Sequence, residues 1–196
     1  GKGEVIGHTV LAGIILPNEL YREFEMHVGS ADTKIKHQVE YWDEIFKKLD
    51  FYKSKGFNFI IQKIPPWQID KYNINKILDI TYQRMLNLLL NGLNIKDVRI
   101  VIDDYGSGFH LNRYLKVLEK AGAEVIKQSK ADEFYLESKV ASIIAKREQQ
   151  KVIEAIADNP EYKLEENDRE IVVNFLTHPN SQVRLAAFQT LKRQNL

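Results

Sequence analysis

The segment Lys130-Ala131-Asp132, followed by Ala141-Ser142-Ile143-Ile144-Ala145-Lys146, decides how this chain is interpreted. Its first part places the carboxylate of Asp132 just past a predicted strand. Its second part lies on a predicted helix and carries a serine and, one turn later, a lysine. A second carboxylate, Asp103, directly follows an earlier apolar strand. Two carboxylates delivered from neighbouring strand ends can hold Mg²⁺ or Mn²⁺, hard cations that prefer oxygen ligands.

Strands and helices alternate along most of the chain. This alternation predicts an α/β fold, with a mixed sheet that includes parallel strands and is flanked by helices. On the helix at 73–90 we expect Ile77, Ile80 and Leu88 to share the apolar face. The predicted strands are 5–16, 57–61, 98–102 and 124–127, and the predicted helices are 38–49, 73–90, 112–121 and 138–157. Residues 19–28 are expected to form a short helix or an irregular connection.

The character of the sequence changes after Pro160. We therefore expect a catalytic domain at residues 1–158 and a C-terminal helical extension, residues 159–196, packed on it. Residues 176–187 look like one HEAT-type helical repeat, and one repeat alone cannot form a solenoid. An ordinary helical hairpin is the favoured interpretation, and a truncated or partner-binding tail is the alternative.

Composition narrows the possible classes of protein. The chain has no cysteine, which excludes a disulfide scaffold, a thiolate metal site and a cysteine nucleophile. No apolar run is long enough to span a membrane, and the sequence fits a monomer in a reducing cytoplasm. The formal net charge is +1, so any contact with nucleic acid depends on a local patch of charge.

The ordered set of motifs closely resembles the type 2 ribonuclease H family (ribonucleases HII and HIII). The resemblance covers roughly residues 1 to 155. Its parts are Lys130-Ala131-Asp132-Glu133-x-Tyr135 with Ala141–Lys146, a glycine-basic-glycine loop at Gly1-Lys2-Gly3, an element similar to Asp-Ser-Lys at Asp32-Thr33-Lys34, Asn75 before the central helix, and the acidic strand Val101-Ile102-Asp103.

The resemblance implies a ribonuclease H-like fold and an endonuclease that hydrolyses the RNA strand of RNA–DNA hybrids. The products would carry 3′-hydroxyl and 5′-phosphate ends, the cofactor would be Mg²⁺ or Mn²⁺, and the partner would be a hybrid or a ribonucleotide-containing duplex. Asp103 and Asp132 would be the catalytic metal ligands. The implied substrate-binding residues are Gly1, Lys2, Gly3, Lys34, Asn75, Ser142 and Lys146.

Each of these residues also has an ordinary structural interpretation. An aspartate after a strand is usually a turn residue or a helix cap. Lys34 and Lys146 could belong to solvated helix faces, and Ser142 could be a small packing residue. His110 follows closely after Asp103, but a loop histidine is the safer interpretation.

The sequence departs from the family pattern at its start. The family carries an Asp-Glu pair just before the glycine-basic-glycine loop, and Glu4 is a poor substitute for it. We expect the native protein to carry this pair upstream, on a strand between the strands at 5–16 and 98–102. A structure in which those two strands pair directly would contradict this expectation.

Two further alternatives stay open. The chain could be a catalytically inactive relative that binds nucleic acid or a protein partner, or another nuclease of this fold that acts on DNA. Arg147-Glu148 stands where the family usually has an Arg-Asp pair. Tyr162 is the nearest candidate for the family's substrate-stacking tyrosine, although its surroundings do not match.

Overall fold

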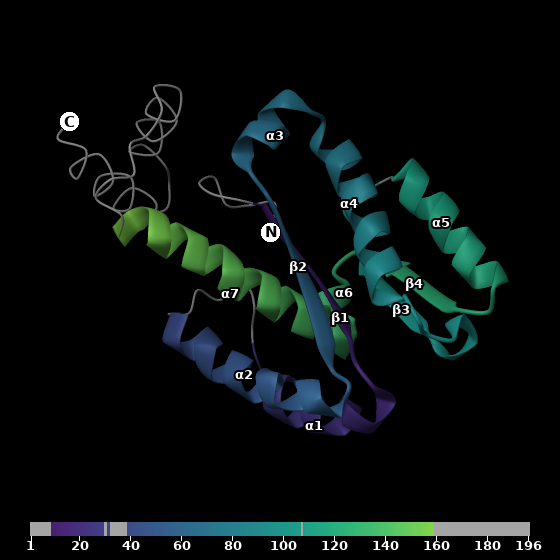
Figure 1. Ribbon diagram of the computed structural model, residues 1–196, viewed down its shortest axis with the longest axis horizontal. Coiled ribbons are helices and arrows are strands. Elements are labelled where there is room, and N and C mark those ends of the chain that lie inside the picture. Colours follow the sequence, from purple (N-terminus) through teal and green to yellow (C-terminus); the bar gives the residue numbers. More distant parts are fainter. Residues whose placement is uncertain (1–8, 30, 32–38, 107, 159–196) are drawn as a thin grey trace. The chain divides into compact units, whose positions relative to one another are not determined.

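The computed structural model describes residues 9–29, 31, 39–106 and 108–158. Within these ranges the predicted strands and helices occur in the predicted order, and two short helices that were not predicted, α3 and α6, are added (Figure 1). The strands are β1 (Thr9–Ile15), β2 (Asn58–Ile64), β3 (Arg99–Asp103) and β4 (Glu124–Gln128). The helices are α1 (Tyr21–Val28), α2 (Val39–Phe51), α3 (Pro66–Lys71), α4 (Ile74–Leu89), α5 (Phe109–Lys120), α6 (Ala131–Phe134) and α7 (Leu136–Asp158), with short 3-10 turns at Asn18–Leu20, Tyr52–Lys55 and Ile95–Asp97.

The four described strands form two separate pairs. β1 and β2 are antiparallel, with Thr9 opposite Ile64 and Ile15 opposite Asn58. β3 and β4 are parallel and are connected through α5, with Arg99 opposite Glu124. Direct pairing of β1 with β3 would contradict the expected strand between them. In the described part of the chain, no backbone ladder joins β1 to β3.

One hydrophobic cluster joins α1, α2 and α7 to one face of the β1–β2 pair. Phe24 and Trp42 are almost fully buried in it, together with Ile143 and Ile144 of α7. The alternate residues that pack against this cluster are Ala12 and Ile14 of β1 and Leu16, which directly follows the strand. Because side chains on a strand alternate between faces, these contacts assign one face of β1 to the α7 side.

A second hydrophobic cluster joins β3 to α5. Ile100 and Ile102 are buried against Leu111 and Leu115, and partly buried residues of α4 pack against the same cluster. The remaining residues of β3, Arg99 among them, therefore point to the other face of the strand.

Helix α4 covers the face of the sheet opposite to α7. It begins after Asn73, whose side chain accepts a hydrogen bond from the Asn75 backbone N–H at 2.9 Å. Gly13 of β1 lies so close to α4 that an added Cβ would meet Leu89 Cδ1 at 2.7 Å. A side chain at this position would require Leu89 to shift, so glycine favours the close approach of the strand and the helix.

The predicted apolar face of α4 was wrong. Ile80 and Leu88 are exposed, whereas the buried residues are Leu78, Met85 and Leu89, together with the acidic Asp79. α4 packs between a sheet and α5, so its buried stripe follows the tertiary contacts rather than the most apolar sequence spacing. Directly after β2, Pro66 begins α3 at the first helical position, where its missing N–H costs no hydrogen bond.

The backbone contacts divide the chain into two compact units, residues 1–150 and 151–196. Of the second unit, only residues 151–158 at the end of α7 are described, so the proposed boundary at 158 and the C-terminal extension stay predictions. The HEAT-like segment and Tyr162 lie outside the described residues. Among the described helices, none is long and apolar enough to cross a membrane.

Candidate active site

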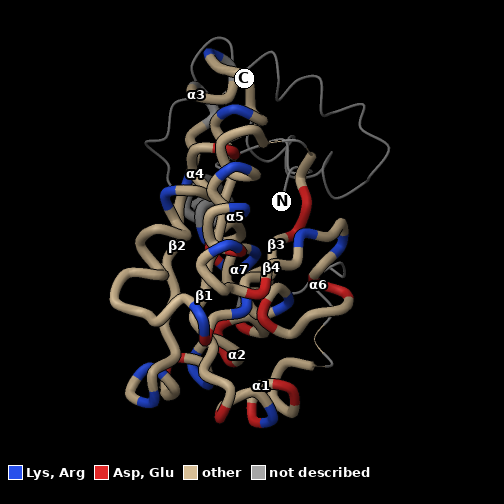
Figure 2. Tube along the Cα trace, turned by 90° about the vertical axis from the view of Figure 1, so that its right-hand side faces the viewer, with Lys and Arg blue, Asp and Glu red and all other residues tan. Residues whose placement is uncertain are grey.

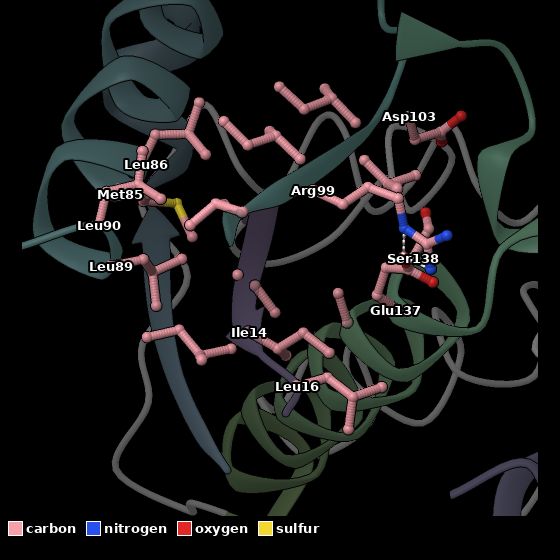
Figure 3. A pocket seen from close by; sticks show the side chains of 18 of the residues that line it. Ile14, Leu16, Met85, Leu86, Leu89, Leu90, Arg99, Asp103, Glu137 and Ser138 are labelled. Atoms are coloured by element: carbon pink, nitrogen blue, oxygen red, sulfur yellow. Dashed lines mark hydrogen bonds and ion pairs between the residues drawn. The ribbon is translucent and has the colours of Figure 1, made fainter. Parts of the chain in front are cut away.

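A groove of about 570 Å³ separates β1 from β3, and we refer to it as the inter-strand groove. Its edges are residues 10–15 of β1 with the adjacent Leu16, and residues 98–103 at β3. Figure 3 shows bulky apolar side chains of α4 entering it from one side, and Glu137 and Ser138 of α7 lying on the other. The α4 lining includes Met85, Leu86, Leu89 and Leu90, and the α7 lining consists of Glu137, Ser138, Ala141, Ser142 and Ala145.

Asp103 and Asp132 both line the same end of this groove. Asp103 is the last residue of β3, and its Oδ1 accepts a hydrogen bond from the Ala131 backbone N–H at 3.2 Å. This bond holds the residue before Asp132 against Asp103, so the two carboxylates are neighbours although 29 positions separate them. The sequence prediction that they share the carboxyl edge of the sheet agrees with this geometry.

The turn that presents Asp132 has an unusual backbone. Lys130 adopts the left-handed conformation, with φ of 58°, and no other described residue besides glycines has a positive φ. This conformation costs a residue with a side chain roughly 1 kcal/mol. It reverses the chain directly after β4, so that α6 begins at Ala131 and its amide reaches Asp103.

Asp104 is the third carboxylate at this edge, and it is held by the surrounding loop. Its Oδ1 lies 3.1 Å from Lys127 Nζ and accepts a hydrogen bond from the Gly106 backbone N–H at 3.0 Å. Lys127 Nζ also donates to Asn112 Oδ1 at 3.0 Å and to the Gly106 carbonyl at 3.2 Å. Asp104 therefore stabilises the loop after β3, and its acidic charge is balanced by Lys127.

Two tyrosines stack beside the acidic edge. The rings of Tyr82 and Tyr105 lie 5.0 Å apart at an interplanar angle of 19°. Burial, followed by the negative charges of Asp103 and Asp104, raises the pKa of Tyr82 to about 12. Burial and the nearby Asp79 carboxylate also raise the pKa of Tyr105. Both phenols consequently stay neutral at physiological pH and can act as hydrogen-bond donors.

The opposite end of β3 carries an ion pair that lines the groove. Arg99 Nη2 and Nε lie 2.6 Å and 2.9 Å from Glu137 Oε1, as the dashed line in Figure 3 indicates. The other carboxylate oxygen, Glu137 Oε2, is buried and has no hydrogen-bond partner among the described residues. The groove thus has apolar walls, a carboxylate pair at one end and an unsatisfied acceptor toward the other.

Charge is otherwise distributed without a dominant sign. In the view of Figure 2, acidic and basic segments alternate along the described elements. The acidic residues at the ends of β3 and β4 therefore form a local feature rather than part of a broad acidic surface.

The structure brings together only some of the residues predicted from sequence. Ser142 lines the groove with both aspartates, whereas Lys146 lies one turn further along α7 and is not among the lining residues. Asn75 lies exposed in the first turn of α4, because Asn73 rather than Asn75 caps that helix. The predicted positions Gly1, Lys2, Gly3 and Lys34 lie outside the described residues.

The carboxylate pair fits part of a metal site. Asp103 and Asp132 supply oxygen ligands of the kind that Mg²⁺ and Mn²⁺ prefer, and both border open space in the groove. Within the described ranges, however, no group of three or more acidic or histidine side chains is placed to hold a metal ion. Any further protein ligands would have to come from a segment entering the groove or from residues outside those ranges.

Comparison with solved structures shows that the chain shares the fold of ribonucleases of the type 2 ribonuclease H class. The structure is similar to ribonuclease H2 from Pyrococcus horikoshii (TM-score 0.63, 20% identity, 98% of this chain and 95% of that chain). It is also similar to ribonuclease HII in its complex with PCNA from Archaeoglobus fulgidus (TM-score 0.58, 24% identity, 90% and 83%). The predicted mixed α/β fold of the ribonuclease H type is confirmed.

Sequence comparison assigns the family. The model of the family described as Ribonuclease HII matches residues 1–168. The ribonuclease HII of Sulfurisphaera tokodaii is 30% identical over 162 residues, which cover 80% of this chain and 70% of that protein. That of Aeropyrum pernix is 28% identical over 149 residues, covering 74% and 62%. The chain belongs to the ribonuclease HII family, and it spans between three fifths and three quarters of the length of these two relatives.

Sequence reasoning missed the residues that organise the site without belonging to a motif. Asp104 directly follows Asp103 and could have been noticed for that reason. The partners Arg99 and Glu137 are 38 positions apart, and no local pattern links them. Tyr82 lies in the middle of α4, where the predicted helical face gave no reason to single it out.

Proposed function

We propose that this protein is a metal-dependent endonuclease that hydrolyses the RNA strand of RNA–DNA hybrids. The observation that carries the proposal is the meeting of Asp103 and Asp132 at one end of the inter-strand groove, in a member of the ribonuclease HII family. The water oxygen would form a bond to phosphorus while the bond from phosphorus to the ribose 3′ oxygen breaks. The products are a 3′-hydroxyl end and a 5′-phosphate end.

Asp103 and Asp132 would hold Mg²⁺ or Mn²⁺, which when bound activates water and stabilises the leaving oxygen. The bond from the Ala131 amide fixes one oxygen of Asp103, so its other oxygen can turn toward the groove. Ser142 borders the same space and can donate a hydrogen bond to a phosphate. Lys146, Lys34, Asn75 and the loop Gly1-Lys2-Gly3 complete the proposed contacts with an RNA–DNA hybrid or a ribonucleotide-containing duplex.

The test is cleavage of a hybrid labelled on its RNA strand, by the native protein, with and without Mg²⁺. Asp103→Asn and Asp132→Asn should each lower the rate on the order of 100-fold or more, because each removes an anionic metal ligand. Asp50→Asn is a matched control, since Asp50 is exposed, pairs with Lys53 and does not line the groove. Absence of metal-dependent cleavage, or full activity of Asp103→Asn, would refute the proposal.

One observation favours a second candidate function. The described residues do not bring three metal-binding side chains together, as expected of a non-catalytic relative that binds hybrid duplex or a protein partner. In that case Asp103→Asn would leave hybrid binding unchanged, and affinity would fall with salt concentration through a few lysine–phosphate contacts. Measuring binding and cleavage with the same hybrid separates the two functions.

A further inference from the structure

Helix α5 has an exposed face that the candidate active site does not use, and we refer to it as the α5 basic face. Its members recur at spacings of four, three and four residues, which places them on one side of an α-helix. All are exposed. The opposite side of the helix is buried in the cluster with β3. The members of the face are Phe109, Arg113, Lys116 and Lys120.

The positive charges of the α5 basic face are not neutralised by neighbouring carboxylates. In the part of the chain that the structure describes, Arg113, Lys116 and Lys120 form no ion pair, whereas Lys53, for example, is paired with a carboxylate. Glu119 is the only acidic residue of the helix. The helix dipole favours a cation in the last turn, which accounts for Lys120 alone. Because like charges three or four positions apart weaken a helix, the fold itself gives no reason for this row of cations.

The α5 basic face begins beside the carboxylate edge of the candidate active site. Asp103 ends β3 and Phe109 begins α5, with five residues between them. Because α5 leads from the end of β3 to the start of the parallel strand β4, the helix runs away from that edge. At 1.5 Å per residue, the face extends for about 17 Å. In Figure 2, where α5 lies toward the viewer, basic segments recur along the helix.

The side chains of the face match the chemistry of a single nucleic-acid strand. Lysine and arginine bind backbone phosphates, and an exposed aromatic ring stacks on an unpaired base. Phe109 is 73% exposed, so its ring is available for such stacking. We propose that the α5 basic face binds a single-stranded tail that leaves the hybrid at the carboxylate edge, an inference that rests on the function proposed above. A length of about 17 Å corresponds to roughly five nucleotides at 3.4 Å each.

The face is less suited to a duplex or to a protein segment. The bases of a duplex are stacked on one another, so they leave Phe109 without a base to contact. A protein partner needs apolar area to bury, and besides Phe109 the only large apolar residue exposed on α5 is Val117. A single strand uses both the cations and the ring.

The experiment measures binding of the 196-residue chain to a fluorescent RNA–DNA hybrid, with and without a tail. The hybrid has about eight base pairs, and the tail has about six thymidine nucleotides, enough to cover the face. EDTA removes divalent metal, so binding is measured without cleavage. The tail is placed in turn at each of the four strand ends. At one of these positions we expect it to tighten binding about tenfold or more, through three phosphate contacts and one stacked base.

Protein variants separate the charge from the ring. The triple variant Arg113→Gln, Lys116→Gln, Lys120→Gln should reduce the gain from the tail to less than about threefold. It should also lower the slope of log affinity against log salt by about two, because each single-strand phosphate contact contributes about 0.7. Phe109→Ala should reduce the gain about fivefold or more and leave the salt slope unchanged, because stacking releases no counterions.

A matched control removes the same charges from another surface. The triple variant Arg22→Gln, Lys47→Gln, Lys48→Gln takes one arginine and two lysines from exposed positions of α1 and α2. It should keep the full gain from the tail. If this control lost the gain as well, the tail would be responding to total charge, and the α5 basic face would be overturned.

Crosslinking tests the location of the tail directly. The chain has no cysteine, so Lys116→Cys introduces a single thiol that can carry a photoactivatable aryl azide. This group should crosslink to the tail of a tailed hybrid. The same group on Lys48→Cys should not, and equal crosslinking from both positions would contradict the proposed location.

The outcomes separate this inference from the proposed function. Absence of a gain at all four tail positions, or a full gain in the α5 triple variant, would overturn the inference. An equal gain from a duplex extension, insensitive to Phe109→Ala, would assign the face to duplex and also overturn it. Tail-dependent binding without Mg²⁺-dependent cleavage would support the α5 basic face and count against the proposed function, whereas cleavage without any effect of a tail would do the reverse.

Discussion

Replacing Asp79 tests how the edge of the site is held in place. Asp79 lies on α4 and is only 4% exposed. Its Oδ2 accepts a hydrogen bond from the His110 backbone N–H at 2.9 Å, and its Oδ1 accepts one from Leu111 at 2.7 Å. Gly108, the residue that precedes α5, has no side chain to serve as a cap. Asp79 therefore caps α5 from another helix and fixes the loop that follows Asp103.

The expected cost follows from the burial of the two donors. Leu111 is fully buried, so its amide would lose its partner without access to water, at a cost of about 1–3 kcal/mol. His110 is exposed, so water can replace its bond. Loss of the negative charge at the start of α5 adds roughly 0.3–1 kcal/mol. We expect Asp79→Ala to lower the free energy of unfolding by about 2–4 kcal/mol, and Asp79→Asn by about half as much, because one oxygen acceptor remains.

The assay is urea denaturation followed by circular dichroism, with stability taken from the midpoint at an unchanged slope. Asp97→Ala is the control, since Asp97 is exposed and its loss should change stability by less than about 0.5 kcal/mol. Gly108→Ser gives an independent check. Serine is ordinarily a good helix cap, but here its Cβ would collide with the Asp79 carboxylate and the Tyr105 hydroxyl, so it should destabilise the protein.

The reasoning is refuted if Asp79→Ala is as stable as the parent protein within about 0.5 kcal/mol. It is also refuted if Gly108→Ser stabilises the protein, because that would mean that the space beside Asp79 is open. Either result would show that α5 is capped in another way.

Two further predictions concern groups that line the groove. Tyr82 has a folded pKa of about 12 against an ordinary value of 10.0, so the unfolded chain loses this proton first as the pH rises. The stability that Tyr82 contributes is present below pH 10 and is lost between pH 10 and 12, by roughly 3 kcal/mol. Tyr82→Phe should flatten that part of a stability–pH curve, and an unchanged slope would contradict the assignment. Separately, Arg99→Met leaves the Glu137 carboxylate, 16% exposed, without its cation and should cost about 1–3 kcal/mol. Glu137→Gln in the same chain should recover part of that loss in a double-mutant cycle, and purely additive effects would mean that the pair is not coupled.

The sequence by itself determined the kind of fold and half of the site. Alternating apolar runs and amphipathic stretches gave the order of strands and helices, because the periods of 2 and 3.6 are local properties. Asp103 and Asp132 were predicted to meet because Asp103 ends one strand, Asp132 follows the next, and the two strands are parallel neighbours. Ser142 lines the same groove because its motif lies on the helix that follows directly, and its role in binding substrate stays a prediction.

Tertiary structure decided the features that depend on contacts between distant residues. The exposed Ile80 and the buried Asp79 on α4 follow from which neighbours that helix meets, and hydrophobic spacing does not encode these neighbours. The Arg99–Glu137 pair and the capping of α5 by Asp79 join positions more than 30 residues apart.

The inter-strand groove is the clearest case of this division. The sequence led us to expect a strand between two others, but only the three-dimensional arrangement shows that, among the described strands, β1 and β3 do not pair with each other and have open space between them, with the carboxylate pair at one end. The physical reason is that pairing between strand edges is a property of backbones brought together in space. Local sequence specifies each strand and leaves its neighbours to the fold.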